Sequence, residues 1–310
     1  MQMKNIIRIG TRESQLAVWQ ARQVKDLLTR NGYTAELVEI KSEGDLDLNT
    51  PLYEMGVQGI FTRSLDAALV NKKIDVAVHS MKDVPTQLPA GISQAAVLKR
   101  GPVHDLLVFK DSTDFLDDKD YIANIATSSL RRKAQWLNKY PRHRIHNLRG
   151  NVNTRLKKLN DENWDAAIFA QAGLERIHLR PDNSRIIDWM IPAPAQGAIV
   201  VVCRSGDEFI SEACQSFNDA DTALCTRIER DFLRELLGGC STPISALATI
   251  TNNLLHFRGS ILSLDGSRKL EMEKNNIPLQ MAKDFGKMAA RELLSTGGRE
   301  IMEEIRHATR

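Results

Sequence analysis

Hydroxyl and guanidinium side chains are concentrated in the segment Thr127-Ser128-Ser129-Leu130-Arg131-Arg132, where a predicted strand passes into a helix. Free backbone amides at a helix start, together with hydroxyls and guanidiniums, suit a bound carboxylate or phosphate. The alternative is an ordinary serine cap followed by solvent-facing arginines. We favour the anion site, because residues 131–158 contain ten Lys or Arg and no Asp or Glu and so concentrate positive charge.

A second polar segment, Val78-His79-Ser80-Met81-Lys82-Asp83-Val84-Pro85, closes a predicted buried strand. The ends of strands are where open α/β sheets place ligands. Asp83 could stabilise a developing cation or move a proton, and Lys82 could bind an anion or keep that carboxylate ionised. The alternative leaves Asp83 as a turn residue and His79 as a hydrogen-bonded, partly buried histidine. The residues alone do not separate these two interpretations.

Two further positions are weaker candidates. Thr11-Arg12-Glu13-Ser14 opens the first predicted helix and offers another anion site, although one Arg beside one Glu is usually a surface pair. Cys240 follows Gly238-Gly239 at a predicted helix end, where a thiol can be exposed and activated, but most lone cysteines are inert. The cysteines at 203, 214 and 225 are expected to be reduced, buried side chains, since no Cys-x-x-Cys pair indicates a zinc site.

These candidates lie on alternating strand and helix patterns, which predict an α/β fold with a parallel sheet and crossover helices. Apolar residues at spacings of three and four predict helices over Ser14–Leu28, Phe61–Val70 and Leu130–Lys139. The β-branched runs that predict strands are Ile6–Ile9, Ala35–Ile40, Ile74–Val78, Leu106–Phe109, Ile122–Ala126, Ile145–Asn147, Ala166–Phe169 and Ile199–Cys203.

The last third of the chain has a different pattern and predicts a separate α+β domain. A helix is predicted from about Thr222 to Leu237, ended by a glycine pair. An antiparallel meander follows, with turns at Asn252-Asn253 and Asp265-Gly266. Its predicted strands are Ile244–Thr251, Leu254–Leu264 and Arg268–Glu273. The apolar residues that start a closing helix are Met281, Phe285 and Met288.

Short internal similarities suggest two related lobes ahead of that domain. Ile9-Gly10-Thr11 resembles Ile125-Ala126-Thr127, and Asp75-Val76-Ala77-Val78 resembles Asp165-Ala166-Ala167-Ile168. Lobes related in this way would carry equivalent strand ends. Because the matching segments are short, chance similarity remains an alternative to duplication.

Composition and charge limit the class of protein. A chain of 310 residues is expected to form two or three domains, and 42% hydrophobic with 26% charged residues is typical of a globular protein. The net charge of +3 predicts no polyanion partner by itself. No segment predicts a membrane span, and the first residues lack the apolar stretch of a secretory signal, so a cytoplasmic location is expected.

Five motifs occur in order along the chain. They are Gly10-Thr11-Arg12-Glu13-Ser14, Val78-His79-Ser80-Met81-Lys82-Asp83-Val84-Pro85, Thr127-Ser128-Ser129-Leu130-Arg131-Arg132, Leu148-Arg149-Gly150-Asn151-Val152-Asn153-Thr154-Arg155 and Gly238-Gly239-Cys240. Taken together, they make the chain resemble the porphobilinogen deaminase (hydroxymethylbilane synthase) family along essentially its whole length. The resemblance implies two similar lobes like those of periplasmic binding proteins, with doubly wound mixed sheets, and a smaller C-terminal α+β domain with an antiparallel three-stranded sheet. It implies domain 1 at 1–98 and 197–216, domain 2 at 102–192, and domain 3 at 219–310.

The resemblance also implies a transferase of tetrapyrrole (haem) biosynthesis. Such an enzyme condenses four porphobilinogen molecules head to tail, with loss of ammonia, onto a covalent dipyrromethane primer and releases linear hydroxymethylbilane by hydrolysis. One dipyrromethane cofactor per chain would be joined to Cys240 by a thioether. Every pyrrole bears an acetate and a propionate, which gives the basic stretch an anionic partner. No metal, nucleic acid or membrane is expected as a partner, and a monomer is expected.

Residue roles follow from positions within the motifs. By the resemblance, Asp83 stabilises positive charge on pyrrole nitrogens as ammonia leaves. The implied cofactor-binding residues are Ser80, Lys82, Thr127, Ser128, Ser129, Arg131, Arg132, Arg155, Gln196 and Gly197, of which the last two lie in the segment that crosses back to the first lobe. The residues implied to bind substrate carboxylates are Arg12, Ser14, Arg149, Arg155 and Arg176.

One departure from the family concerns the loop before the second predicted helix, which acts in the family as a mobile lid. Glu54 and Gln58 stand where many relatives carry two lysines. A carboxylate there would repel an anionic substrate, so either the loop contacts the chain differently or Arg63 and Lys41 compensate. We assign neither Glu54 nor Gln58 to binding.

Two other classes of protein could use the same residues. A two-lobed solute-binding or effector-sensing module would hold a carboxylate ligand in these anion sites, although the absence of a secretory signal disfavours a periplasmic one. The mass of the chain separates that module from the enzyme, which carries two extra pyrrole units. Nucleic-acid binding through residues 131–158 lacks the aromatic interleaving that such surfaces use.

Overall fold

The computed structural model describes residues 6–41, 62–236 and 242–308. Their contacts divide the chain into two compact units. Unit 1 comprises residues 6–41, 62–101 and 197–224, and unit 2 comprises residues 102–196, 225–236 and 242–308 of the described chain. Because the split groups contacts only, the predicted three-domain division remains a prediction. None of the helices described in the structure is long and apolar enough to cross a membrane.

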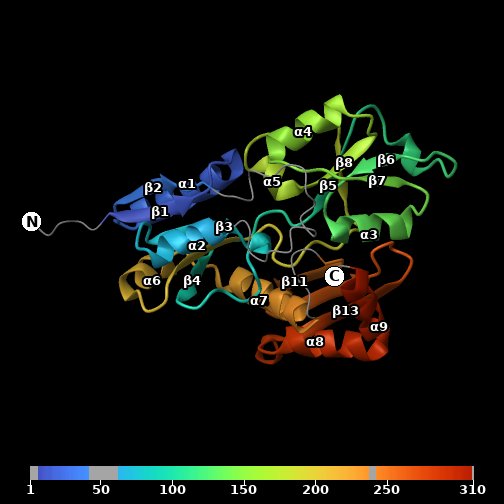
Figure 1. The fold of residues 1–310 in the computed structure, drawn as a ribbon. Helices are drawn as coiled ribbons and strands as arrows, with labels where there is room; N and C mark the ends of the chain where they lie inside the picture. Colours follow the sequence, from blue (N-terminus) through green and yellow to red (C-terminus); the bar gives the residue numbers. More distant parts are fainter. Residues whose placement is uncertain (1–5, 42–61, 237–241, 309–310) are drawn as a thin grey trace, which may run out of the picture. The chain divides into compact units, whose positions relative to one another are not determined.

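Unit 1 is built on a five-stranded mixed sheet in the order β2-β1-β3-β10-β4 (Figure 1). Strand β1 is parallel to β2 and β3, whereas β10 is antiparallel to both of its neighbours. The strands are β1 (Ile7–Thr11), β2 (Ala35–Glu39), β3 (Val76–Ser80), β4 (Ile92–Val97) and β10 (Ile199–Arg204). The strand patterns predicted all of these except β4, and the family resemblance implied that β10 belongs to the first lobe.

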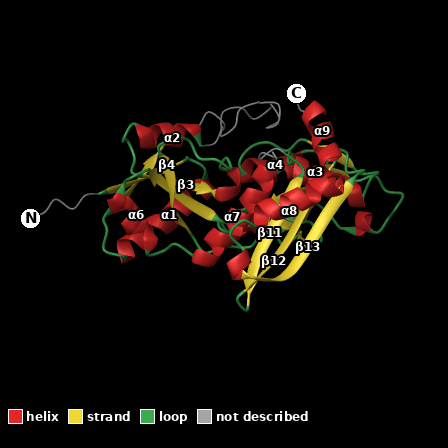
Figure 2. Cartoon of the chain, turned by 90° about the horizontal axis from the view of Figure 1, so that it is seen from below, coloured by secondary structure: helices red, strands yellow, loops and turns green. Residues whose placement is uncertain are grey.

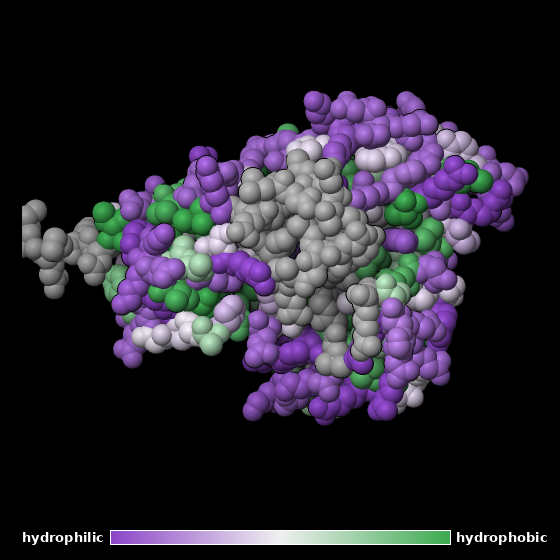
Figure 3. Space-filling model, viewed as in Figure 1, coloured by the Kyte–Doolittle hydropathy of each residue, from purple (hydrophilic) through white to green (hydrophobic). Residues whose placement is uncertain are grey.

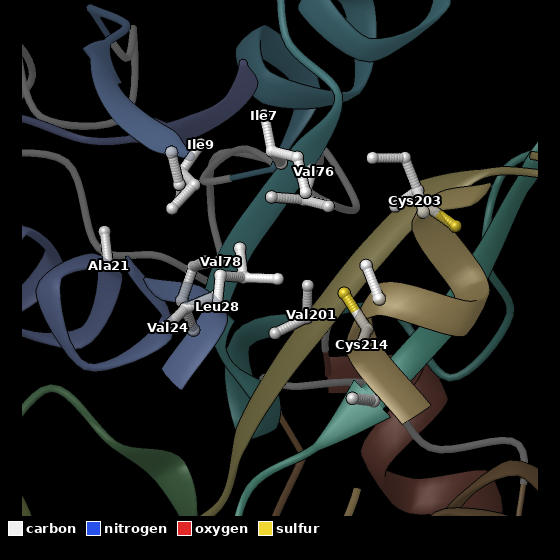
Figure 4. Packing of buried hydrophobic residues seen from close by; sticks show 14 of the residues in the cluster. Ile7, Ile9, Ala21, Val24, Leu28, Val76, Val78, Val201, Cys203 and Cys214 are labelled. Atoms are coloured by element: carbon white, nitrogen blue, oxygen red, sulfur yellow. The ribbon is translucent and has the colours of Figure 1, made fainter. Parts of the chain in front are cut away.

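Helices cover both faces of this sheet because its strands are apolar on both sides. Helices α1 (Gln15–Arg30) and α6 (Glu208–Gln215) pack on the face that carries Ile9, Val78 and Val201 (Figure 4). Helix α2 (Arg63–Val70) contacts the strands as well. A Cβ on Gly10 would approach the end of the Ile74 side chain to 2.2 Å, so a larger residue at this position of β1 would displace that side chain. Cys203 and Cys214 are buried in the core, as predicted.

Unit 2 contains a second five-stranded mixed sheet, in the order β7-β6-β8-β5-β9. Helix α3 (Leu130–Lys139) contributes Trp136 to one apolar cluster, while α4 (Val152–Asp161) and α5 (Gln171–Glu175) contribute Leu159 and Leu174 to another. Helix α4 lies under a hydrophilic part of the surface in Figure 3. The strands are β5 (Asp105–Phe109), β6 (Asn124–Ala126), β7 (Arg144–His146), β8 (Ala166–Ala170) and β9 (Ser184–Ile187).

The two sheets have the same topology, which supports the internal similarity seen in the sequence. In each, three parallel strands are followed by a strand antiparallel to both of its neighbours. Ile9 pairs with Val76 in one sheet as Ile125 pairs with Ala166 in the other. The carboxylates of Asp75 and Asp165 accept the backbone N–H of Arg8 and Asn124, respectively. The similar segments thus occupy equivalent places.

The rest of unit 2 is the predicted three-stranded antiparallel meander, β11-β12-β13 (Figure 2). Its strands are β11 (Ile244–Thr251), β12 (Leu254–Leu262) and β13 (Lys269–Pro278), and its helices are α8 (Phe285–Leu293) and α9 (Arg299–Ala308). Helix α7 (Ala220–Glu235) precedes it, starting in unit 1 and continuing into unit 2. Short 3₁₀ turns cover Met81–Asp83, Asp114–Leu116 and Leu279–Met281, and a π-type turn covers Leu294–Gly298.

The expected start of the closing helix was wrong. Met281 lies in the 3₁₀ turn before α8, and both Met281 and Met288 are more than half exposed. The helix is buried through Gly286, Ala289, Ala290 and Leu293 instead, and a Cβ on Gly286 would come within 2.1 Å of the Ile228 carbonyl oxygen. Of the three predicted residues only Phe285 packs inward, against Phe257 with ring centroids 5.5 Å apart, and a close backbone approach at Gly286 accompanies it.

Candidate functional site

The polar segment of unit 1 forms a fixed turn at the end of strand β3. Ser80 ends the strand, and its Oγ accepts a hydrogen bond from Gln20 Nε2 of helix α1 at 2.8 Å. The backbone N–H of Met81 donates to the Ala198 carbonyl just before β10, at 3.0 Å. Asp83 ends the 3₁₀ turn and is half-buried. The carboxylate is thus held at the carboxyl end of a parallel strand, where α/β sheets bind ligands.

His79 is buried deeper than the sequence suggested. It points from β3 away from the Val78 core, and its Nε2 has no hydrogen-bond partner among the described residues. Burial, with a smaller contribution from the positive charge of Arg12, lowers the pKa of His79 to about 4. The imidazole is therefore neutral at physiological pH, and the interpretation of His79 as a hydrogen-bonded, partly buried residue was wrong for Nε2.

Arg12 and Ser14 lie where β1 passes into α1. Ser14 is the N-cap of α1, and its Oγ accepts from the Ala17 backbone N–H at 3.4 Å. Arg12 is half-buried. Unit 1 thus contains Asp83 together with Lys82, Ser80, Arg12 and Ser14. It also holds Gly197, whose φ of +85° and carbonyl bond from the Gly101 N–H at 3.0 Å fix the chain before β10.

The hydroxyl residues of unit 2 shape the turn between β6 and α3. Ser129 is the N-cap, as the alternative interpretation expected, and accepts from the Arg132 backbone N–H at 3.4 Å. Thr127 Oγ1 accepts from the Ser129 N–H at 3.2 Å. Ser128 Oγ lies 2.7 Å from the Leu148 carbonyl oxygen and accepts from the Leu148 N–H at 2.9 Å. This network ties the helix start to the loop that carries Arg149.

Arg131 and Arg132 are buried, which excludes the solvent-facing alternative. Their exposed fractions are 4% and 6%, and both pair with the fully buried Asp105 at the start of β5. Arg131 Nη2 lies 2.7 Å from Asp105 Oδ2, and Arg132 Nη2 lies 2.8 Å from Oδ1. Gln196 Nε2 donates to Oδ1 at 3.0 Å. Burial lowers the pKa of Arg131, whereas Asp105 raises it. Two guanidiniums share this carboxylate, so the cluster carries an excess positive charge.

Three further arginines of unit 2 lie on or next to helices α4 and α5. Arg149 is buried and precedes Gly150, whose φ of +110° turns the chain into α4. Arg155 lies half-buried on α4. Arg176 follows α5, and burial lowers its pKa to about 10, which leaves it charged at neutral pH. Unit 2 therefore groups the predicted carboxylate-binding arginines other than Arg12.

Several predicted features lie outside the described residues or were missed. Cys240, Glu54 and Gln58 fall outside the described residues. Asp105 was missed, although a charged residue at the start of an apolar strand is an unusual feature that can reveal a buried partner. Among described residues, no group of three His, Cys, Asp or Glu could hold a metal ion.

Comparisons with known proteins agree along the chain. Residues 7–212 match the family model described as "Porphobilinogen deaminase, dipyromethane cofactor binding domain", and residues 223–295 match "Porphobilinogen deaminase, C-terminal domain". The chain is 40% identical to the porphobilinogen deaminase of Desulforamulus reducens over 98% of its length and 99% of that protein. It is also 40% identical to that of Acidithiobacillus ferrooxidans, covering 99% and 100%.

Among solved structures, the chain is similar to the periplasmic VFT2 domain of Bordetella pertussis BvgS. The TM-score is 0.42 at 13% identity, and the match covers 71% of this chain and 91% of that domain.

Proposed function

Because the chain belongs to the porphobilinogen deaminase family, we propose that it condenses four porphobilinogen molecules, with loss of ammonia, onto a covalent dipyrromethane and releases hydroxymethylbilane by hydrolysis. The observation that carries the proposal is the buried cluster of Arg131, Arg132 and Asp105, with its excess positive charge. Every pyrrole ring brings two carboxylates, and a buried arginine binds a carboxylate through charge-assisted hydrogen bonds.

The residues present fit a dipyrromethane. Its carboxylates would offset the spare charge of the Arg131–Arg132 cluster, and the hydroxyls of Thr127, Ser128 and Ser129 lie beside that helix start. Bound through a thioether to Cys240, the dipyrromethane would supply the free pyrrole carbon that takes up the first substrate ring, and each later ring would join the ring added before it. Ser80, Lys82, Arg155, Gln196 and Gly197 complete the proposed cofactor-binding set.

Asp83 is proposed to stabilise positive charge on pyrrole nitrogens while ammonia leaves. A carboxylate placed in advance where positive charge develops costs no reorganisation during the reaction. The hydrogen bond from Gln20 to Ser80 supports this role, because it fixes the strand end that leads into the Asp83 turn. Lys82, next to it, is proposed to bind a carboxylate of the bound chain.

Arg12, Ser14, Arg149, Arg155 and Arg176 are proposed to bind substrate carboxylates. Burial makes this recognition stronger than it would be on the surface, since charge pairs in a low-dielectric environment are less screened. The lowered pKa of Arg176, about 10, still leaves this side chain cationic at neutral pH. The set binds the anionic groups of a chain that grows to six rings.

The remaining proposals concern the whole chain. We propose three domains with the boundaries 1–98 plus 197–216, 102–192 and 219–310, a monomer in solution, and a cytoplasmic location. Sedimentation equilibrium of the purified protein tests the monomer directly, because it measures the mass of the particle in solution and a dimer would show twice the mass of the chain.

Intact mass of the purified protein tests the function. The chain should carry the mass of two pyrrole units beyond its sequence, and Cys240→Ser should lose both that mass and turnover. A solute-binding module would show the unmodified mass in both. Turnover is measured as formation of the linear tetrapyrrole from porphobilinogen; an unmodified, inactive wild-type chain would overturn the proposal.

Asp83→Asn tests the proposed catalytic role separately. The variant should keep the added mass and the fold but lose turnover about 10²- to 10³-fold, because the amide cannot neutralise a cation. Lys287→Gln is the matched control, since Lys287 forms an exposed pair with Asp284 on α8. Normal turnover by Asp83→Asn would exclude the assigned role.

A further inference from the structure

Gln135 is a buried amide on helix α3 that no role above uses. Its Nε2 donates to the Ile191 carbonyl and to Ser245 Oγ, both at 2.9 Å, and its Oε1 accepts from the Ile191 backbone N–H at 2.9 Å. Ser245 is fully buried. The side chain therefore pairs with both backbone groups of Ile191, as a neighbouring strand would, and also reaches strand β11.

The position of Gln135 on α3 links it to the arginine cluster. It follows Arg131 by one helical turn, so the two side chains share a face of the helix. Arg131 Nη1 donates to the same Ile191 carbonyl at 2.9 Å. This carbonyl oxygen thus accepts from both side chains, and any shift of the Ile191 segment changes the support of the Arg131 guanidinium.

The partner on the other side, Ser245, stands at the start of β11. Strand β11 begins at Ile244, four residues after Cys240 in the sequence. We propose that Gln135 is a positioning residue, which holds the strand that follows the cofactor-bearing Cys240 in register with the helix that carries Arg131 and Arg132. The inference rests on the proposed function and adds to it a residue that touches neither substrate nor cofactor.

Helix α3 offers a matched control on its neighbouring face. Asn138 Nδ2 donates to the Gly266 carbonyl at 2.8 Å, in the turn between β12 and β13. This bond also joins α3 to the three-stranded sheet, but it contacts neither Ile191 nor the arginine pair. Loss of the Asn138 bond therefore weakens the same packing interface without moving the cluster.

The experiment compares Gln135→Ala, Ser245→Ala and Asn138→Ala with the wild-type full-length chain. Intact mass gives the fraction that carries two pyrrole units, and steady-state kinetics gives kcat per loaded molecule and KM for porphobilinogen. We expect Gln135→Ala to lower kcat about tenfold, since small displacements of reacting groups have effects of this size. KM should stay within twofold, because the proposed substrate arginines are unchanged.

Ser245→Ala keeps the Gln135–Ile191 pair and removes only the bond to β11, so it should reproduce most of the kcat loss even where Gln135→Ala folds poorly. The double variant should be no worse than Gln135→Ala alone, because Ser245 acts only through its hydrogen bond to Gln135. Asn138→Ala should lower Tm with kcat unchanged.

Two results would overturn the positioning role. In the first, Gln135→Ala and Ser245→Ala lower Tm but leave kcat per loaded molecule at the wild-type value. In the second, Asn138→Ala lowers kcat as much as they do, which would make the effect a general loss of packing. A wild-type chain without the added mass would instead overturn the proposed function, and the positioning role with it.

Discussion

The carboxylate of Asp105 is fully buried and accepts charge-assisted hydrogen bonds from Arg131 and Arg132. Such a pairing gives little net stability compared with apolar residues, because both partners lose their hydration. Removal of the Asp105 carboxylate, in contrast, is expected to be strongly destabilising, because it leaves the buried charges of Arg131 and Arg132 without compensation. The residue thus sets both the position and the charge balance of the two guanidiniums.

Asp105→Asn is therefore expected to destabilise unit 2 by about 3–5 kcal/mol, the usual cost of breaking a buried pair on one side. Urea denaturation followed by far-UV circular dichroism measures this change. Asp120→Asn is the control, because Asp120 pairs with Arg142 at the surface and is 94% exposed, so its loss should cost less than about 1 kcal/mol. Equal stability of both variants would contradict the electrostatic role of Asp105.

The lowered pKa of His79 makes the stability of the folded chain depend on pH. Its pKa is about 4 in the folded chain, below the ordinary value of 6.5, so between these values the unfolded chain binds more protons. The stabilising contribution of neutral His79 to the free energy of unfolding is thus fully present above pH 6.5. It is lost as the pH falls toward 4, by up to about 3 kcal/mol.

Chemical denaturation at pH 7, 6, 5 and 4 measures this loss in the wild type and in His79→Gln. The variant should show a shallower fall in the free energy of unfolding over this range. His307→Gln, which replaces an exposed histidine, should follow the wild type. Identical curves for wild type and His79→Gln would show that the imidazole is not responsible.

At the scale of elements, the contact between α3 and the turn from β12 to β13 is unusually close. Gly266 has a φ of +75°, and a Cβ there would approach the Ala134 carbonyl oxygen to 2.4 Å and the Asn138 backbone N to 2.7 Å. Both neighbours are backbone atoms of a helix and cannot rotate away. The turn can therefore pack on α3 only as glycine.

Gly266→Ala is expected to lower the free energy of unfolding by about 2–4 kcal/mol, as backbone strain and overpacking add. Gly206→Ala separates the two effects, because Gly206 has a φ of +79° and no atom within 4 Å of the added Cβ. It should cost about 1 kcal/mol, from strain alone. Thermal unfolding of both variants gives the comparison, and equal losses would mean that the helix contact is unimportant.

Elements with strong local patterns could be predicted from the sequence. Strands β3, β8 and β10 contain unbroken apolar runs of three to five residues, and the meander is marked by its turns. Strand β4 reads Ile-Ser-Gln-Ala-Ala-Val, a half-polar run without a clear period, and was missed. Edge strand β9, with exposed Arg185 and Ile186, was missed for the same reason.

The residues of the candidate site also differ in whether a local sequence pattern marks them. Asp83, Arg131 and Arg132 could be named as candidates from the sequence because they lie in dense polar motifs. Asp105 and Gln135 were not assigned, since each acts through partners that are far away in the sequence and leaves no local pattern. Burial could not be predicted for His79 either, because it depends on how the sheet is covered.

At the scale of the whole molecule, each unit has its own five-stranded sheet, and in each of these sheets one strand is antiparallel to two neighbours. Val202 lies in β10 opposite Ala77 and Gln94, and Val108 lies in β5 opposite Ala167 and Ser184. Proline in a central strand removes a ladder hydrogen bond and distorts both pairings.

Val202→Pro is expected to destabilise unit 1 by several kcal/mol, and Val108→Pro to do the same to unit 2. Hydrogen exchange read by mass spectrometry on peptides from β3 and from β8 distinguishes them. Val202→Pro should speed exchange in β3 far more than in β8, and Val108→Pro should give the opposite pattern. If either proline speeds exchange equally in both peptides, the two units unfold together and the division by contacts does not reflect stability.

Strand β10 also affects the order in which the two five-stranded sheets can form during synthesis. Strands β1 to β4 are synthesised by Val97, but the strand that fills the gap between β3 and β4 starts at Ile199, about 100 residues later. At ribosomal rates of about 5–20 residues per second, β10 is synthesised about 5–20 s after β4, and the first sheet cannot be completed before then. During that interval the nascent chain exposes two unpaired strand edges, while the sheet of residues 105–187, continuous in the sequence, can already close. We therefore expect the N-terminal part of the chain, which contains β1 to β4, to depend on chaperones more than residues 105–187 do during synthesis.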